Sequence, residues 1–410
     1  MDLNQPRVNI TYGEKPVPQN WISELVAETK YPPLPMVDRK YKAFGPAPVQ
    51  ANATAFYRSM MPAIVLRNYY GVMDYISGFE IAQDADLWTR YINASEILVI
   101  EREFNDNIVP GVKRYKSLNG PVLFDLDDHI HQFKSMKIFH SKTEKQINEF
   151  WDEEVLESFN NVVAECDAVI TTTQSLANYY KTVHNKRAFC IRNAIDSIST
   201  RWNFNFEKMD SRDFIVFGFM GGSTHGADLD ILEPVVREVL DTCPNVKFKF
   251  IGYTPKWLFD LFDDGYRKRV LTDFGFTKLD KYPEKMYNID VGLAPLANNE
   301  FNRIGKSDLK YLEYTMAGAA TVASKIGQYK ESIKNKQNGL LVDNTTEDWV
   351  RVLTRLAQNP QEIIKIQKAA VEDVLKNRTI ITEAREWYNV MISERKRWES
   401  KPTVILTKEI

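Results

Sequence analysis

The stretch KSDLKYLEYTMAGAATVAS, residues 306–324, predicts a short amphipathic helix that runs directly into a buried strand. Leu309, Leu312 and Met316 recur at helical spacing and would form the buried stripe of that helix. Gly318 suits the position just past the helix end, where a left-handed backbone is common. The run AATVAS that follows is typical of a strand covered on both faces of a parallel sheet.

Charge gathers on one edge of the same helix. At about 100° per residue, Lys306, Lys310 and Glu313 fall within about 60° of one another. Ser307 can cap the start of the helix. A solvated pair between Lys310 and Glu313 would explain two of these charges. A ligand site would explain all three, provided that the rest of the chain brings a second surface to this edge.

Apolar runs alternate with helical patterns on both sides of this stretch. The runs after residue 205 are FIVFGFM, VKFKFIG, IDVGLAPL and GLLV, and those before it are AIVL, ILVIE, PVLFDLDD, AVITTT and AFCIRN. They lack polar alternation, as do strands buried on both faces of a parallel sheet. We therefore predict an α/β fold with two Rossmann-like, doubly wound domains that face each other across a cleft.

Four segments follow from composition and pattern in the 410-residue chain. Residues 1–50 are rich in proline and polar groups and predict an extended arm. Residues 51–205 and 206–385 would be the two Rossmann-like domains. Residues 386–410 would be a helix and tail that pack back on the N-terminal domain.

Charge and targeting signals restrict the partners. The 53 basic and 55 acidic residues nearly balance, which argues against a global attraction to nucleic acid or an anionic membrane but leaves a local basic groove open. Cys166, Cys190 and Cys243 lack a metal-ligand spacing and suit a reducing compartment. Without a leader or an apolar run of membrane-span length, we expect a cytoplasmic protein, with peripheral membrane contact possible.

The segment FGFMGGSTHGADLDIL, residues 217–232, predicts a strand, a glycine turn and a helix. Gly221 and Gly222 would let the backbone approach a ligand, and the N–H groups from Ser223 to His225 would suit a phosphate. A plain tight turn explains the glycines about as well.

A polar loop lies between the next strand and the charged helix. It carries Asn298, Asn299, Phe301, Asn302 and Arg303. With Lys306, Ser307 and Lys310 at the helix start, this loop would form a second anion site facing the glycine turn. A pyrophosphate between them would be held by backbone N–H groups and ammonium charge, while Glu313 could accept hydrogen bonds from ribose hydroxyls.

These motifs resemble the C-terminal domain of retaining GT-B glycosyltransferases of family 4, the glycosyl transferases group 1. Those enzymes carry a K-x-x-E-aromatic-x-x-x-G helix before V-A-S and then N-G-L-L-V, matched here by Lys310, Glu313, Tyr314, Gly318, TVAS and NKQNGLLVDN. The chain looks closest to a branch found in polysaccharide and rhamnan-type clusters. That branch is matched at Thr224, His225 and Asp228, at 290–296, at 301–313, and at Asp348 and Trp349.

The resemblance implies sugar transfer from a UDP- or GDP-linked donor, bound in the C-terminal domain, to an acceptor hydroxyl on the N-terminal side. It implies retention of configuration, with no cofactor and no metal. The chain departs from the pattern at two positions, because Gly305 stands where the first glutamate of an E-x7-E pair would be and His225 replaces a basic residue. Lys306 and Lys310 would then neutralise the phosphates.

The N-terminal half offers an acceptor side. FDLDDHIH, residues 124–131, ends a strand in carboxylates and histidines, and Asp127, Asp128 or His129 could orient or polarise the acceptor hydroxyl. A metal site or a helix cap are the alternatives for the aspartates. Thr172 and Thr173, at the carboxyl end of a strand, and Asn193, in the approach to the hinge, are further acceptor-side candidates. A polar strand end, with Ser175 capping the helix that follows, would explain each of them singly.

Two other functions remain open from the sequence. The first is a phage-type enzyme that glycosylates hydroxymethylated DNA bases, which would need a local basic groove. The second is a non-catalytic scaffold of the same fold, favoured by the two departures from the family pattern. The leading prediction is a hexosyl- or pentosyltransferase that acts on a saccharide or a lipid-linked saccharide.

Overall fold

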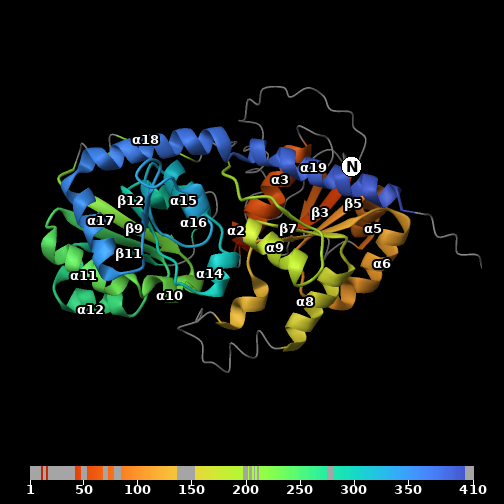
Figure 1. Ribbon diagram of the computed structural model, residues 1–410, viewed down its shortest axis with the longest axis horizontal. Helices are drawn as coiled ribbons and strands as arrows, with labels where there is room; N and C mark the ends of the chain where they lie inside the picture. Colours follow the sequence, from red (N-terminus) through yellow and green to blue (C-terminus); the bar gives the residue numbers. More distant parts are fainter. Residues whose placement is uncertain are drawn as a thin grey trace, which may run out of the picture.

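Two parallel sheets of six strands each form the cores of two domains in the described part of the chain (Figure 1). The computed structural model describes residues 11–12, 15–16, 42–47, 53–67, 73–77, 85–135, 153–196, 202, 206, 208–209, 212–274, 277 and 281–401. A separate antiparallel pair joins β1 (Thr11–Tyr12) to β2 (Lys15–Pro16). The predicted α/β class, with two doubly wound domains, is confirmed.

The C-terminal sheet has the strand order of a Rossmann fold. Its strands are β9 (Ile215–Gly221), β10 (Val246–Gly252), β11 (Val270–Phe274), β12 (Val291–Ala294), β13 (Ala320–Ser324) and β14 (Leu340–Val342). They lie in the order β11-β10-β9-β12-β13-β14. Successive strands are added on one side of β9 as far as β11, and on its other side from β12 onward, so the strand order reverses between β9 and β12. Sheets of this kind bind ligands outside the carboxyl ends of the strands at that reversal.

The N-terminal sheet is built from β3 (Ala43–Ala47), β4 (Met73–Ser77), β5 (Ile97–Glu101), β6 (Val122–Leu126), β7 (Ala168–Thr171) and β8 (Ala188–Cys190). The strands lie in the order β4-β3-β5-β6-β7-β8. Strand β3 falls inside residues 1–50, so this part of the expected arm belongs to the sheet instead. Most of residues 1–41 lie outside the described residues.

One predicted strand is a helix. The run AIVL, residues 63–66, lies in a helical stretch made of α2 (Ala53–Ala55), the π-helical turn η1 (Phe56–Met60) and α3 (Met61–Val65). Every side chain of α3 is buried, and α3 packs against the C-terminal helix. A short apolar run fits a buried helix as well as a buried strand, which is why the pattern alone misled.

The other helices connect the strands of each sheet. In the N-terminal domain they are α5 (Ala85–Ala94), η3 (Asp106–Ile108), α6 (Val109–Leu118), η4 (Ile130–Ser135), α8 (Glu153–Glu165) and α9 (Gln174–Thr182). In the C-terminal domain they are η5 (Ser223–His225), α10 (Gly226–Leu229), α11 (Leu232–Thr242), α12 (Trp257–Asp263), η6 (Tyr266–Lys268), α13 (Tyr282–Met286), α14 (Glu300–Ile304), α15 (Leu309–Met316), α16 (Tyr329–Ser332) and α17 (Thr346–Gln358).

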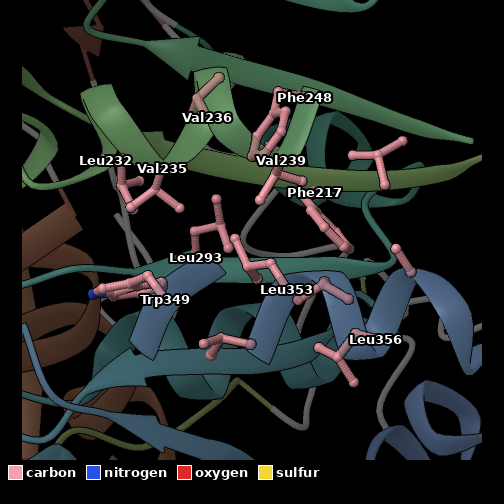
Figure 2. Packing of buried hydrophobic residues seen from close by; sticks show 14 of the residues in the cluster. Phe217, Leu232, Val235, Val236, Val239, Phe248, Leu293, Trp349, Leu353 and Leu356 are labelled. Atoms are coloured by element: carbon pink, nitrogen blue, oxygen red, sulfur yellow. The ribbon is translucent and has the colours of Figure 1, made fainter. Parts of the chain in front are cut away.

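The C-terminal core contains the apolar stripe of α11. The five apolar residues of this stripe are fully buried, namely Leu232, Val235, Val236, Val239 and Leu240. Figure 2 shows the labelled aliphatic side chains of α11 near the rings of Phe217 and Phe248, with Trp349 of α17 in the same cluster. Burying one such aliphatic side chain contributes about 1.5–3 kcal/mol, so this layer fixes the strand ends that carry the site.

The last two helices join the domains. Helix α18 (Pro360–Asn377) packs on the C-terminal domain, and α19 (Ile380–Glu399) packs on the N-terminal core through Trp387 and its neighbours (Figure 1). The crossing begins at Ile380, before the expected boundary at residue 386. None of the helices in the described part of the chain combines the length and apolar character that a membrane crossing requires.

The charged helix of residues 306–318 starts later than the sequence predicts. Helix α15 begins at Leu309, so Lys306 and Ser307 precede it, and Ser307 does not cap it. Asp308 takes the capping position, but its carboxylate binds Arg378 through two hydrogen bonds of 2.5 and 2.9 Å. Gly318 has the predicted left-handed backbone, with φ of 72°.

Candidate active site between the two domains

The two central strands of the C-terminal sheet separate at their carboxyl ends, and helix α15 fills the gap. Strand β12 pairs with β9 only at Val291 and Gly292. Beyond that, the hydroxyl of Tyr314 accepts from Met220 N–H at 3.0 Å and donates to Leu293 O at 3.1 Å. Gly292 makes room for this ring, because a Cβ there would lie 2.2 Å from it. Through Tyr314, helix α15 is thereby fixed between the ends of these two strands.

Lys310 reaches the same strand end. Its ammonium donates to Met220 O and lies 4.7 Å from the ring centroid of Phe219. A Cβ at Gly221 would lie 2.8 Å from the lysine Nζ, so the absence of a side chain there allows the close approach. Burial, together with repulsion from Lys306, lowers the pKa of Lys310 to about 8, while the charge of Glu313 acts in the opposite direction. Lys310 is still mostly cationic at neutral pH.

His225 faces this lysine as a neutral imidazole. Its Nδ1 lies 2.7 Å from Oδ2 of Asp228, and a carboxylate can only accept, so Nδ1 carries the hydrogen. Burial, followed by the positive charges of Lys310 and Lys306, lowers the pKa of His225 to about 3. The residue that replaces the family's basic position therefore adds no positive charge of its own.

Asp228 ties the glycine turn to the loop after β12. Its Oδ1 accepts from Ala297 N–H at 2.7 Å and from Asn302 Nδ2 at 2.9 Å. Asn302 is 1% exposed and also donates to Ala297 O, so it holds the loop from within. Arg303 is exposed and donates to Asn298. Of the two loop residues predicted to bind the donor, Asn302 is thus enclosed by protein and Arg303 points to solvent.

Glu313 receives a hydroxyl from each domain. Its Oε1 accepts from Tyr57 at 3.0 Å, and its Oε2 accepts from Tyr282 at 3.0 Å. Tyr57 lies in η1 of the N-terminal domain, whereas Tyr282 begins α13 of the C-terminal domain. The carboxylate is only 4% exposed, which rules out the simple solvated pair with Lys310.

The predicted carboxylates of the N-terminal domain face this site. Asp127 lies 3.4 Å from Arg102 and accepts from Thr54 at 2.9 Å, and Asp128 lies 3.8 Å from Lys306. Burial, with the adjacent charge of Asp127, raises the pKa of Asp128 to about 6, against the effect of Lys306 and Arg102. Arg102 has a left-handed backbone, with φ of 41°, which is uncommon for a residue other than glycine.

His129 lies at the domain contact but not at an accessible surface. The residue is 0% exposed, its ring packs 4.4 Å from that of Tyr179, and neither ring nitrogen has a hydrogen-bond partner in the described part of the chain. A Cβ at Gly305 would lie 2.5 Å from the backbone nitrogen of His129. The position of the missing glutamate is therefore closed to any side chain in this arrangement.

The three predicted acceptor-side residues make contacts within or between the domains. Thr172 donates to Asp127 O at 3.0 Å, and Thr173 donates to Ile304 O at 2.5 Å. Asn193 donates to Ser307 Oγ at 3.0 Å and accepts from Arg58 at 3.2 Å. Thr173 also caps α9 by accepting from Leu176 N–H, a role that the sequence had suggested for Ser175.

Two of the predicted glycine-turn residues add little to this description. Gly222 is exposed, and no described atom lies within 4 Å of the place where its Cβ would be. Ser223 starts η5, and its side chain is outside the described part of the structure. The residues that meet at the end of β9 are thus Gly221, His225 and Lys310.

Sequence reasoning missed several residues of the site. They are Thr54, Tyr57, Arg58, Arg102 and Tyr282. The side chain of Arg58 is 1% exposed and binds Asp125 through two hydrogen bonds of 2.6 and 3.0 Å. A single arginine within the apolar segment FYRSMMPAIVL was the one available signal, because a buried cation needs a buried partner.

Metal-binding geometry was also a possible reading of the aspartates. Within the described residues, no group of three or more histidine, cysteine, aspartate and glutamate side chains is arranged to hold a metal ion. Asp127 and Asp128 are instead directed at Arg102 and Lys306.

Comparisons with known proteins agree with this architecture. Residues 215–359 match the family described as Glycosyl transferases group 1. The Anabaena protein Alr3699/HepE, solved with UDP, aligns at a TM-score of 0.58 and 14% identity over 86% of this chain and 100% of that chain. A glycosyltransferase from Rickettsia africae ESF-5 aligns at a TM-score of 0.59 and 12% identity, over 88% of this chain and 100% of that chain.

A sucrose-phosphate synthase from Thermosynechococcus elongatus aligns at a TM-score of 0.57 and 11% identity, over 86% of this chain and 98% of that chain. None of the curated proteins matches the sequence. The chain therefore shares its fold with GT-B glycosyltransferases, and its residues 215–359 match the glycosyl transferases group 1.

Proposed function

We propose that the protein transfers a sugar from a nucleoside-diphosphate sugar to an acceptor hydroxyl, with retention and without a metal. The observation that carries this proposal is the close approach of the Lys310 ammonium to Gly221 where the strand order reverses. Glu313 lies one helical turn beyond Lys310 on the same helix. An ammonium group, a bare glycine turn and a buried carboxylate match the phosphates and the ribose of such a donor. The matched family segment contains all three residues.

The donor base and sugar are proposed from structural neighbours solved with bound nucleotides. HepE has been solved with UDP and with UDP-glucose, which favours a UDP-linked sugar as the first donor to test. TarM of S. aureus has been solved with UDP and α-GlcNAc-glycerol. We therefore propose a saccharide-type acceptor. The DNA acceptor considered from the sequence has no support among these proteins.

In the proposed reaction, the C-terminal domain stabilises the leaving diphosphate. As the bond between the anomeric carbon and the diphosphate oxygen breaks, negative charge builds on that oxygen. In this proposal, Lys310 and Lys306 supply the compensating positive charge, and the N–H groups after Gly221 add further donors. Glu313 orients the donor through its ribose hydroxyls.

The N-terminal domain presents the acceptor. In the proposed reaction, the acceptor oxygen bonds to the anomeric carbon and its proton passes to a carboxylate of the Asp127–Asp128 pair. The raised pKa of Asp128, about 6, suits a group that accepts a proton near neutral pH. His129 is buried, so we assign it a structural role and not contact with the acceptor.

A panel of nucleotide sugars, screened by thermal shift, tests the proposal. At least one UDP- or GDP-linked sugar should raise the melting temperature, and the same compound should be hydrolysed slowly without an acceptor. The anomeric configuration of a transfer product, read by NMR, then tests retention. If no nucleotide sugar stabilises the protein or is turned over, the non-catalytic scaffold becomes the better interpretation.

A further inference from the structure

The carboxylate proposed to bind the donor ribose is already engaged by the opposite domain. The phenol of Tyr57 donates to Oε1 of Glu313 at 3.0 Å, and both residues are almost fully buried, at 5% and 4% exposed. Tyr57 and Glu313 are 256 residues apart in the chain. This hydrogen bond therefore exists only while the two domains are in contact.

Tyr57 is held firmly on the N-terminal side. It lies in the π-helical turn Phe56–Met60, and its ring packs edge-on against Phe56 with centroids 5.0 Å apart. The next residue, Arg58, is fixed by its ion pair with Asp125 and lies 5.1 Å from the ring centroid of Trp387 in α19. Turns of the π type are rare and are frequently found at functional sites. Tyr57 must move with the N-terminal domain, since its neighbours are anchored there.

We propose that Tyr57 is a donor-site residue that occupies, on Glu313, the place of a ribose hydroxyl and is displaced when the donor binds. This inference rests on the proposed function. A phenol and a ribose hydroxyl are equivalent donors to a carboxylate oxygen. Because Glu313 is 4% exposed, a ribose hydroxyl would have to take the place that the Tyr57 phenol occupies on Oε1. Donor binding then replaces the Tyr57 hydroxyl on Glu313 with a ribose hydroxyl. The contact between the two domains at Glu313 is lost as a result.

Tyr282 does not have this role, although it binds the other oxygen of Glu313. It starts α13 in the C-terminal domain and remains beside Glu313 whether or not the domains are in contact. Of the two phenols on Glu313, only Tyr57 comes from the N-terminal domain, so it is the one that can report the domain arrangement to this carboxylate. By linkage, a change that weakens this bond should strengthen donor binding, by at most the same factor.

Calorimetric titration of UDP into the full chain tests the exchange with Tyr57→Phe, which removes one oxygen and keeps the ring. The variant lacks the hydrogen bond between residue 57 and Glu313 that stabilises the UDP-free protein. It should therefore bind UDP about 2- to 10-fold more tightly than wild type. Tyr266→Phe is the matched control, since it removes a phenol that donates to Asp241 at the surface, and it should leave UDP binding unchanged. Inorganic pyrophosphate, which lacks ribose, should bind both proteins equally.

The outcomes separate the two proposals. Weaker or equal UDP binding by Tyr57→Phe, with wild type binding UDP and Glu313→Gln impaired, would overturn the exchange and leave the proposed function standing. An equal gain for pyrophosphate would also overturn it, because Tyr57 would then act through domain packing alone. Absence of binding of UDP and GDP by wild type would refute the donor site itself, and this inference with it. In a Glu313→Gln background, the Tyr57→Phe gain should disappear.

Discussion

The ammonium nitrogen of Lys306 lies 3.8 Å from Oδ1 of Asp128, so a cation of the C-terminal domain faces a carboxylate of the N-terminal domain. The two side chains are 20% and 19% exposed, and an ion pair of this kind contributes little to stability. A diphosphate that arrives beside Lys306 would compete with Asp128 for the same ammonium group. The pair therefore places the proposed leaving group and the proposed proton acceptor next to each other.

Replacing Lys310 by alanine should weaken UDP binding about 10- to 150-fold, since a charge-assisted hydrogen bond contributes about 1.5–3 kcal/mol. Lys306→Ala should have a smaller effect, because Lys306 is 20% exposed and shares its charge with Asp128. Calorimetric titration measures both, with the exposed Lys268→Ala as the matched control. Wild-type affinity in both variants would remove these lysines from the donor site.

Glu313→Gln should reduce donor affinity, because the amide keeps one acceptor oxygen and replaces the other with a donor group. The phenols of Tyr57 and Tyr282 both donate to the wild-type carboxylate, so one of them would lose its acceptor. We expect a small drop in melting temperature alongside a clear loss of UDP affinity. A large drop in melting temperature with intact activity would instead show that Glu313 is structural.

The sequence predicted the local parts of this site and missed those made by distant contacts. Periodicity and glycine positions were sufficient for α15 and for the turn at Gly221, because both depend on neighbours in the chain. Tyr57 and Arg102 carry no pattern of their own, and they matter only because the fold brings Glu313 and Asp127 to them. The sequence likewise could not predict that His129 leaves no room for a side chain at position 305, because these two residues come from different domains.

Asp127→Asn should leave UDP binding nearly unchanged, and Asp128→Asn should leave it unchanged or tighten it, because Asp128 competes with the diphosphate for Lys306. At least one of the two variants should lower transfer about 10²-fold, the scale of acid–base contributions. Both carboxylates belong to the N-terminal domain, whereas the donor groups belong to the C-terminal one. Initial rates and calorimetry on the same preparations check this division. Should either variant lose UDP binding before it loses transfer, the acceptor assignment is wrong.

Transfer should persist in EDTA, because the ammonium groups of Lys306 and Lys310 can stabilise the leaving diphosphate. The measurement is the initial rate before and after exhaustive chelation, with added Mn²⁺ and Mg²⁺ as separate arms. Loss of activity on chelation with recovery in Mn²⁺ would move Asp127 and Asp128 to a metal site and contradict the proposal.

The free energy of unfolding should fall between about pH 7.5 and pH 4 in part because of His129. Burial, followed by the positive fields of His131 and His184, lowers its pKa from the ordinary 6.5 to about 4 in the folded protein. Over that range the unfolded chain binds a proton that the folded chain does not, so stability decreases as pH decreases. The gap between the two pKa values corresponds to about 3 kcal/mol.

His129→Leu removes this titration and keeps an apolar side chain in a site where neither imidazole nitrogen has a partner in the described structure. The variant should be at least as stable as wild type at pH 7.5, and its advantage should grow by up to about 3 kcal/mol as the pH approaches 4. Urea unfolding at half-unit pH intervals gives the difference between the two proteins, in which the contributions of His225 and the other groups cancel. Parallel curves would show that His129 takes up its proton in the folded state, which a fully buried ring packed against Tyr179 should resist.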